Sequence, residues 1–469
     1  MNMRKIAGPM LLGGALLLGL GAAASAQTEE LRIGFLAPRT GIYTAIGTDM
    51  LNGFQMYLDE HNGMLGGAKV KLIVEDDQGK PDVDVAKAKK LILQDKVHML
   101  AGALLASSAY ALGPVSTELK TLYIGTASTA DDLAQRQVDK YPYTVFSVWV
   151  PSQPNHPLGQ WACDQGYKKV VAIAADYAFG YEQTGGFQQS FEDCGGKVIQ
   201  KIWVPLGTKD FGPYLPTMKG DADAIFTLMV GPMSLQFPKQ LRASGNKKPI
   251  VAGGTSYDEF ILPFMGDEVV GDVSALMYSA ALDTPKNQEF VKKYRAKYGK
   301  VPSYYSEGDY SAAQWIDEVI GDVSALMYSA GLDTPKNQEF VKKYRAKYGK
   351  VPSYYSEGDY SAAQWIDEVM AKHKGKFPGP TEFIKTMASI KLDAVRGPVQ
   401  LDLATRSPIQ NIYIKKVEKK EMFGYGKPEL WNTVIKTYPN VSEFWTYDKK
   451  KFLAQPVYSR DFPPCKNCE

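Results

Sequence analysis

Short apolar runs alternate with amphipathic stretches along most of the chain. The runs LRIGFLA from Leu31, KVKLIVED from Lys69 and HMLAG from His98 each have the length of one buried strand. Between them, apolar residues recur at three- and four-residue spacing from Gly47, and Asp82 begins a second stretch of this kind. Because strands that alternate with helices pair in parallel and are covered on both faces, this pattern predicts an α/β fold.

A second series of the same kind follows the first. It begins at KKVVAIAAD and continues through DAIFTLM and PIVAG, with helical segments between these runs. The stretch VPSQPNHP, residues 150–157, interrupts the alternation between the two series. We therefore expect two consecutive α/β lobes, followed from about residue 421 by an aromatic-rich extension without clear periodicity.

One unit of fifty residues occurs twice. Residues 271–320 and 321–370 differ only where Ala281 stands against Gly331 and at their last position. Solenoid repeats drift apart and need at least three units, so two nearly identical copies do not indicate a solenoid. We interpret them as a tandem duplication, or as an error in assembling the gene sequence. We expect the beginning of the first copy and the end of the second to complete the fold.

The N-terminal segment has the pattern of a secretory signal, residues 1–26. Arg4 and Lys5 precede an apolar stretch, and the small residues of ASA end at Ala26, so cleavage would leave Gln27 first. A membrane anchor is the alternative, which Pro9 and the many Gly and Ala residues disfavour. We therefore expect an exported protein that acts in the periplasm.

Charge and cysteines narrow the class of protein further. The formal net charge of +3 over 469 residues gives no indication of a nucleic-acid partner.

The four cysteines fit an oxidising compartment: Cys163 and Cys194 flank one strand–helix unit, and Cys465 and Cys468 form CKNC. Three pairings are possible, and sequence does not choose among them. A zinc half-site is the alternative, but no second ligand pair follows at metal spacing, so we expect structural disulfides.

The sequence contains no nucleophile elbow, no phosphate-binding glycine loop and no metal motif built on histidine. Instead, small polar residues follow two strands, in ALLASSAYALG and IGTASTADDLA. The carboxyl ends of parallel strands form a ligand crevice, and helix N-termini there favour anions. Hydroxyl groups would add donors; the alternative is that they only cap helices. The candidates are Ser107, Ser108, Ser128 and Thr129.

These segments, together with IGFLAPRTGIYTAIGTDM and AADYAFGYEQTGGF, resemble the periplasmic solute-binding proteins of ABC importers. The resemblance covers nearly the whole mature chain and is to the branch that binds branched-chain amino acids and aromatic or other small carboxylic acids. It implies two Rossmann-like, doubly wound lobes joined by a multi-strand hinge, the type I periplasmic binding fold, with no cofactor. The implied divisions are 27–147 and 273–392 for the first lobe, 148–272 and 393–420 for the second, and 421–469 for the extension.

The resemblance also implies where the ligand is held. Its carboxylate would contact two turns, Ala106 to Ser108 and Ala127 to Thr129. Ile46 would face the ligand from the first lobe, and Phe179 would cover it from the second.

Two positions depart from the pattern of amino-acid binders. Ala106 replaces the usual first serine, and Thr255 stands where those proteins place an acidic residue for the ammonium group. Because a buried ammonium without a carboxylate is costly, both departures argue against an ordinary α-amino acid. Glu307, or its copy Glu357, lies near a helix start that faces the cleft in this family and could compensate.

The sequence thus predicts a monomeric binding protein that catches a small carboxylate by hinge closure. It would deliver this ligand to an ABC permease and its ATPase. The alternative is a ligand-sensing receptor of the same fold. An enzyme is the third reading, which no motif supports.

Overall fold

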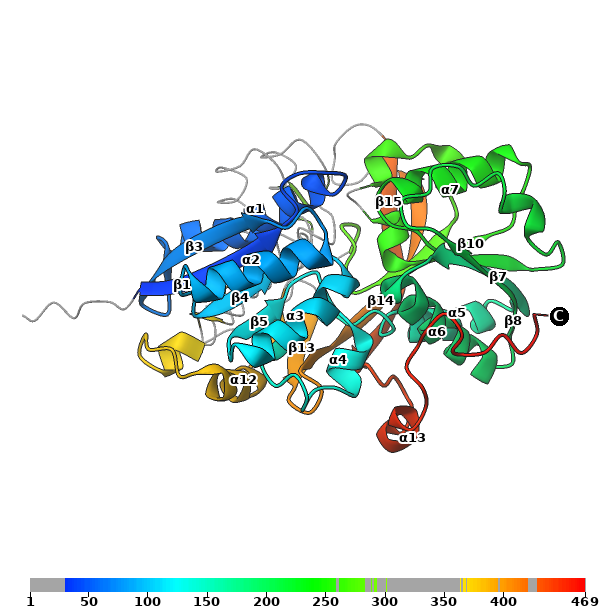
Figure 1. Cartoon of the computed structure of the whole chain (residues 1–469). Coiled ribbons are helices and arrows are strands. Elements are labelled where there is room, and N and C mark those ends of the chain that lie inside the picture. Colours follow the sequence, from blue (N-terminus) through cyan, green and yellow to red (C-terminus); the bar gives the residue numbers. More distant parts are fainter. Residues whose placement is uncertain are drawn as a thin grey trace, which may run out of the picture.

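The computed structural model describes residues 30–258, 261–282, 369–394, 397–420 and 428–468, and positions 288, 291, 292, 301, 363, 366 and 367. Two α/β lobes lie side by side, and the last residues of the chain run to a C-terminus beside the second lobe (Figure 1). The expected signal segment lies outside the described residues, as do Glu307 and Glu357.

The first lobe contains a six-stranded sheet in the order β2-β3-β1-β4-β5-β6, parallel except for the pair β2 and β3. Both β4 and β5 are buried along their whole length, as their continuous apolar runs predict. The strands are β1 (Glu30–Ala37), β2 (Met64–Leu65), β3 (Ala68–Asp76), β4 (Met99–Gly102), β5 (Leu122–Gly125) and β6 (Thr144–Phe146). The helices between them are α1 (Thr44–Glu60), α2 (Pro81–Leu93), α3 (Ala106–Glu118) and α4 (Asp131–Gln135).

A second sheet has nine strands in the order β12-β13-β14-β11-β10-β9-β7-β8, with β15 paired to β14; the strands from β11 to β8 form the second lobe, and β13 lies beside the first lobe (Figure 1). The five strands from β8 to β11 are parallel, and β14 is antiparallel to its neighbours. The parallel strands are β7 (Lys169–Ala175), β8 (Lys197–Val204), β9 (Ala224–Leu228), β10 (Ile250–Gly253) and β11 (Val273–Leu276). The others are β12 (Lys391–Ala394), β13 (Gly397–Asp402), β14 (Ser407–Lys420) and β15 (Glu429–Val441).

Helices complete both lobes. The longer ones of the second lobe are α5 (Asn155–Asp164), α6 (Ala178–Asp193) and α7 (Pro232–Ala243). Four short 3₁₀ helices are η1 (Leu215–Thr217), η2 (Gly254–Tyr257), η3 (Leu262–Phe264) and η4 (Asp267–Val269). Towards the C-terminus, α12 (Pro380–Ala388) lies beside the first lobe and α13 (Lys449–Leu453) lies in the terminal segment (Figure 1).

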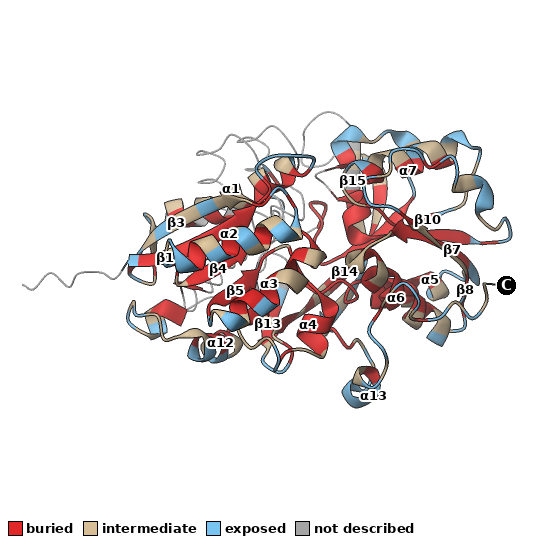
Figure 2. Cartoon of the chain, viewed as in Figure 1, coloured by how far each residue is buried: buried red, intermediate tan, exposed pale blue. Residues whose placement is uncertain are grey.

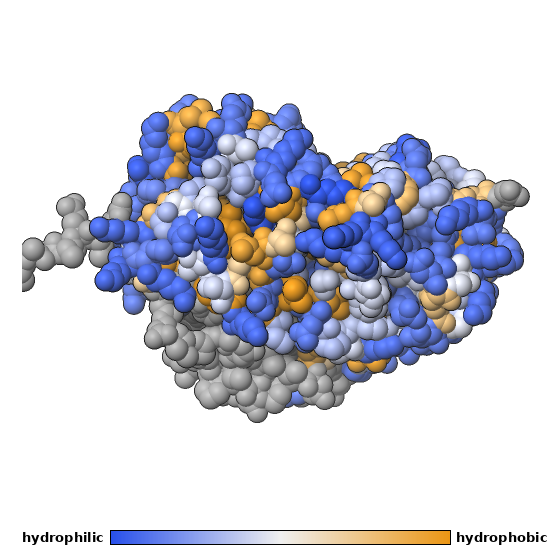
Figure 3. Space-filling model, turned by 90° about the horizontal axis from the view of Figure 1, so that it is seen from below, coloured by the Kyte–Doolittle hydropathy of each residue, from blue (hydrophilic) through white to orange (hydrophobic). Residues whose placement is uncertain are grey.

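Buried residues follow the two sheets, and exposed residues gather on the outer faces of the helices (Figure 2). The surface seen from below is largely hydrophilic at its edges, with apolar side chains gathered towards its middle (Figure 3).

Buried glutamines tie together three segments where the lobes meet, at residues 148–153, residues 408–410 and Val441. The side-chain amide of Gln153 donates to the carbonyl oxygens of Pro408 at 2.7 Å and Val441 at 2.8 Å. The amide of Gln410 donates to the carbonyl oxygen of Val148 at 2.7 Å. Both glutamines are fully buried, so these bonds hold the crossing segments at a fixed spacing where the lobes meet.

Two details differ from the sequence expectation. The strand β11 lies in the second sheet, so the chain leaves that sheet after Leu276 rather than at residue 272. The extension that begins at residue 421 contains β15, a 13-residue strand. Its alternation is hard to see because Asn432 is buried and donates to the carbonyl oxygen of Tyr257, where a simple pattern would place an apolar residue.

The duplicated unit contributes to one core. From the first copy, Val291 and Val301 are buried in the large apolar cluster that runs through the protein. From the second copy, Ala363 and Ile366 are buried in the same cluster. Among the described residues, core positions therefore pass from the first copy to the second between residues 301 and 363.

Both cysteine pairs form disulfides in this structure, Cys163 with Cys194 and Cys465 with Cys468. The first joins α5 to the end of α6 and the second closes a short loop near the C-terminus. Within the described ranges, no helix is long and apolar enough to cross a membrane.

Candidate ligand-binding site

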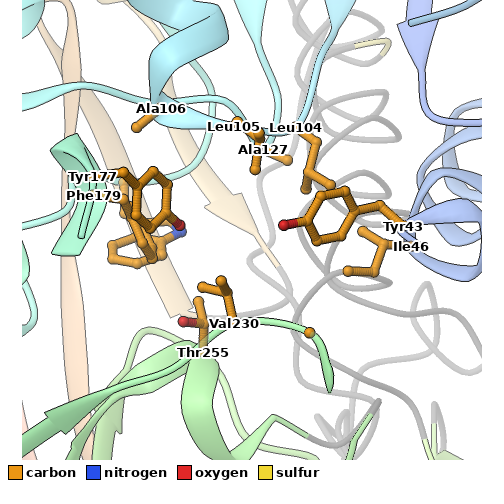
Figure 4. A pocket seen from close by; sticks show the side chains of 12 residues that line it. Tyr43, Ile46, Leu104, Leu105, Ala106, Ala127, Tyr177, Phe179, Val230 and Thr255 are labelled. Atoms are coloured by element: carbon orange, nitrogen blue, oxygen red, sulfur yellow. The ribbon is translucent and has the colours of Figure 1, made fainter. Parts of the chain in front are cut away.

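A small pocket, with a cavity volume of about 30 Å³, lies between the two lobes. Figure 4 shows side chains that approach it from both lobes, with Ala106 and Ala127 on one side and Val230 and Thr255 on the opposite side. Twelve residues line it: Tyr43, Ile46, Leu104, Leu105, Ala106, Ala127, Trp149, Tyr177, Phe179, Val230, Gly231 and Thr255.

The lining residues follow the carboxyl ends of parallel strands in both sheets. In the first lobe they come after β1, β4 and β5, and in the second after β7, β9 and β10. Trp149 lies on the crossing segment between the lobes. This is the edge at which open α/β sheets bind ligands, so the fold itself brings these loops together.

One glycine in each lobe positions a residue of the pocket. A methyl group at Gly47 would lie 2.1 Å from the carbonyl oxygen of Pro38, and one at Gly180 would lie 1.9 Å from that of Ala175. Neither distance leaves room for a side chain, so α1 and α6 can begin this close to the preceding strands only with glycine there. The residues just before these glycines, Ile46 and Phe179, are therefore held at the pocket wall.

Aromatic rings form one wall of the pocket. The ring of Phe179 packs edge-on against Trp149, with centroids 5.6 Å apart and planes at 70°, and lies 6.0 Å from the ring of Tyr177. Across the pocket, the hydroxyl of Tyr43 points inward (Figure 4). Burial raises the pKa of Tyr43, so its hydroxyl stays neutral and can donate a hydrogen bond.

The start of α3 supplies the polar end of the pocket. No side chain caps this helix, and its first residue, Ala106, lines the pocket. The first N–H groups of a helix have no carbonyl partner within it and carry the positive end of its dipole. The N–H of Ser108 already donates to the carbonyl oxygen of Leu105 at 2.8 Å, so the N–H groups of Ala106 and Ser107 are the ones that can receive a carboxylate.

Of the four predicted hydroxyl donors, none is among the lining residues. Ser128 is fully buried; its hydroxyl donates to the carbonyl oxygen of Leu105, and its N–H donates to that of Ala103 at 3.1 Å. Ser128 therefore shapes the turn that precedes α3. Ser107, Ser108 and Thr129 also lie off the pocket wall.

Thr255 lies on the side of the pocket opposite the start of α3 (Figure 4). It is 5% exposed, and its hydroxyl has no hydrogen-bond partner among the described residues. None of the twelve lining side chains is acidic or basic. The described part of the pocket thus offers neutral hydrogen-bonding groups at both ends and apolar walls between them.

The structure brings together five of the predicted positions, namely Ile46, Ala106, Ala127, Phe179 and Thr255. Sequence reasoning missed the other seven. Tyr43 and Tyr177 each immediately precede a helix that follows a strand, and this position is the signal that would have identified them. The described residues contain no cluster of three or more His, Cys, Asp or Glu side chains suited to a metal ion.

Comparison with known proteins decides the family. The sequence profile of the family described as "Periplasmic binding protein" matches residues 30–324 and 316–421. The chain belongs to this family. Its members are solute-binding proteins of ABC transporters, not enzymes, so the prediction of a binding protein of this transport class with a two-lobe fold is confirmed.

Several relatives are similar over long stretches. The Leu/Ile/Val-binding protein homolog 6 of Brucella melitensis is 28% identical over 284 residues, which are 59% of this chain and 72% of that protein. A solute-binding protein of an ABC transporter from Rhodopseudomonas palustris BisB5, solved with 3,4-dihydroxybenzoic acid, is 28% identical with a TM-score of 0.71. That comparison covers 88% of this chain and 98% of the other.

Another solute-binding protein from R. palustris was solved with 4-hydroxybenzoate. It is 26% identical to this chain with a TM-score of 0.70, over 89% of this chain and 99% of the other. Family members bind small molecules and work with permease and ATPase subunits, and this chain shares that role.

Proposed function

We propose that this periplasmic binding protein captures a small aromatic carboxylate between its lobes and delivers it to an ABC permease. The observation that carries the proposal is the lining of the pocket: an uncapped helix start at one end, aromatic walls, and no acidic side chain among the twelve lining residues. A single aromatic ring with one carboxylate would place its ring against the aromatic wall and its charge at the helix start.

The carboxylate binds at the start of α3. The N–H groups there, near Ala106, gain a charged acceptor when the ligand enters. The aromatic ring then lies against Phe179 and Tyr177, where edge and face contacts between rings contribute about 0.5–1.5 kcal/mol per pair beyond burial. The likeness to two proteins solved with hydroxybenzoic acids supports this class of ligand.

The neutral Thr255 disfavours an α-amino acid. An ammonium group placed there would lose its hydration and find no carboxylate among the described lining residues. A hydroxyl group on the ring, in contrast, pairs with the unsatisfied hydroxyl of Thr255. The contribution of Glu307 or Glu357 remains a prediction, as do the roles of Ser107, Ser108, Ser128 and Thr129.

Export and assembly complete the proposal. Cleavage after Ala26 releases the chain into the periplasm, where both disulfides persist. The protein acts there as a monomer and closes its lobes on the ligand.

Isothermal titration calorimetry with benzoate, 4-hydroxybenzoate and leucine tests the ligand class. We expect both aromatic acids to bind and leucine to bind weakly or not at all. Tight binding of leucine, together with no heat from either aromatic acid, would contradict the proposal. A variant with a filled pocket, Ala127→Leu, is expected to lose the aromatic acids while keeping its melting temperature within a few degrees of wild type.

A further inference from the structure

A buried carboxyl group of the second lobe is hydrogen-bonded to the first lobe. Glu182 lies near the start of α6 in the second lobe and is 2% exposed. One of its oxygens accepts a hydrogen bond from the hydroxyl of Tyr110, on α3 of the first lobe. The same oxygen accepts a bond from the N–H of Asp131, at the start of α4, at 3.3 Å. Rotation of the lobes apart would break both bonds.

A second carboxyl group lies beside the first. Asp131 is also 2% exposed, and one of its oxygens accepts a hydrogen bond from the N–H of Ser152, on the crossing segment, at 3.1 Å. The other oxygen of Asp131 and the other oxygen of Glu182 have no partner among the described residues. Two buried carboxyl groups thus lie beside each other between the lobes, with too few donors among the described residues for both to be ionised.

The neighbouring cation is engaged elsewhere. Arg136 follows α4 and lies 4.0 Å from Asp132. Its guanidinium donates to the carbonyl oxygens of Phe452 and Gln455, each at 3.2 Å, in the C-terminal segment. The titratable and charged groups that surround the pair from all packed elements are Tyr110, Asp132, Arg136, His156, Glu443 and Tyr458.

Burial dominates the electrostatics of this cluster. It raises the pKa of Glu182 well above its ordinary value and that of Asp131 to about 7. The charge of Asp131 raises the pKa of Glu182 further, and the charge of Asp132 raises the pKa of Asp131. Burial also raises the pKa of Glu443 and lowers that of His156 to about 3, so the histidine is neutral. Arg136 opposes the rise at Asp131, but burial outweighs it.

We propose that closure of the lobes takes up a proton, which Glu182 and Asp131 hold between them, so that ligand affinity falls as the periplasm becomes more alkaline. The pair thus acts as a latch for the closed form. The proposal rests on the proposed function only for the choice of titrant.

The direction of the pH dependence follows from the linkage between proton binding and closure of the lobes. In the open form Glu182 meets water, and its pKa returns towards about 4. In the closed form its pKa is raised, so closure is fully favoured below the open-form pKa and is progressively disfavoured as pH rises towards the closed-form pKa. For one proton taken up, affinity falls about tenfold per pH unit within that window.

The test measures the affinity of 4-hydroxybenzoate by calorimetry between about pH 6 and pH 8, where the carboxyl group of this titrant stays ionised. Repeating it in two buffers with different ionisation enthalpies gives the number of protons taken up. For the wild type we expect a loss of about 10- to 100-fold over this range. The Glu182→Gln variant mimics the protonated side chain and should lose at least half of the slope, and adding Asp131→Asn should remove the rest.

Glu192 provides a matched control. It lies on the same helix, and burial raises its pKa too, but it bonds within the second lobe, to Gln188 and to the N–H of Val198. Glu192→Gln should therefore keep the wild-type slope. Equal slopes in the wild type and in Glu182→Gln would show that Glu182 does not couple closure to proton uptake.

A second readout does not depend on the titrant. Small-angle scattering of the ligand-free protein gives its radius of gyration, which increases when the lobes open. We expect this radius to increase with pH in the wild type and to stay smaller in Glu182→Gln. If 4-hydroxybenzoate does not bind, the proposed ligand class is wrong, and the scattering series alone tests whether Glu182 and Asp131 hold the lobes closed. Identical profiles for the two proteins would contradict it.

Discussion

The hydroxyl of Thr255 allows the ligand orientation to be tested with one atom. Thr255→Val keeps the shape of the side chain and removes a buried group that has no hydrogen-bond partner in the described structure. In the proposed complex, this hydroxyl pairs with the hydroxyl of 4-hydroxybenzoate, while benzoate leaves it unpaired. The two ligands and two proteins therefore form a thermodynamic cycle that isolates one hydrogen bond.

The size of the effect follows from burial. A polar group left unpaired in a dry site costs about 1–3 kcal/mol. In Thr255→Val, the hydroxyl of 4-hydroxybenzoate is the group left unpaired, so its affinity should fall by about 5- to 150-fold. Benzoate should bind the variant as well as the wild type or slightly better, because neither benzoate nor the introduced valine has a hydroxyl group that would be left without a hydrogen-bond partner.

Calorimetry of both ligands against both proteins measures the cycle. Thr227→Val is the control, because Thr227 is equally buried but its hydroxyl donates to the carbonyl oxygen of Ile173 at 3.0 Å within the second lobe. That variant should lose about 1 kcal/mol of unfolding free energy and keep both affinities. Equal losses for benzoate and 4-hydroxybenzoate in Thr255→Val would refute the orientation.

Three other predictions concern the duplication, the processing of the chain and a glycine. Deletion of residues 321–370 should leave ligand affinity unchanged and raise the melting temperature, because the fold has one place for the unit; loss of folding or binding would show that both copies are needed. The intact mass of exported protein should correspond to a chain that begins at Gln27 and should be lower than that of the reduced chain by the mass of four hydrogens; free thiols in the native protein would exclude two disulfides. Gly180→Ala should displace the start of α6, costing about 1–3 kcal/mol of stability and weakening ligand binding, whereas Gly220→Ala, with open space around it, should do neither.

Much of the fold could be predicted from the sequence because its central strands are buried on both faces. Strands such as β4 and β5 read as continuous apolar runs, and the helices between them show clear periodicity. The strand β15 was missed because it pairs with β14 alone and buries Asn432. The local pattern of apolar and polar residues does not reveal that a polar residue is buried because it bonds a carbonyl oxygen far away in the sequence.

The candidate site could be predicted only in part. The turns after β4 and β5 were identified, but not which of their side chains face the ligand, since Ser128 turns inward to bond Leu105. Tyr43, Tyr177 and Val230 lie on loops, where sequence carries no period to fix the direction of a side chain. The pairing of Glu182 with Asp131 arises only when the two lobes meet, so no local pattern could indicate it.

A crystal structure of the protein with 4-hydroxybenzoate is the most direct test of this binding mode. We expect the ligand between the lobes, with its carboxylate at the N–H groups near Ala106, its ring against Phe179 and its hydroxyl at Thr255. A ligand bound outside this pocket, or one whose carboxylate points to Thr255, would contradict the proposed binding mode.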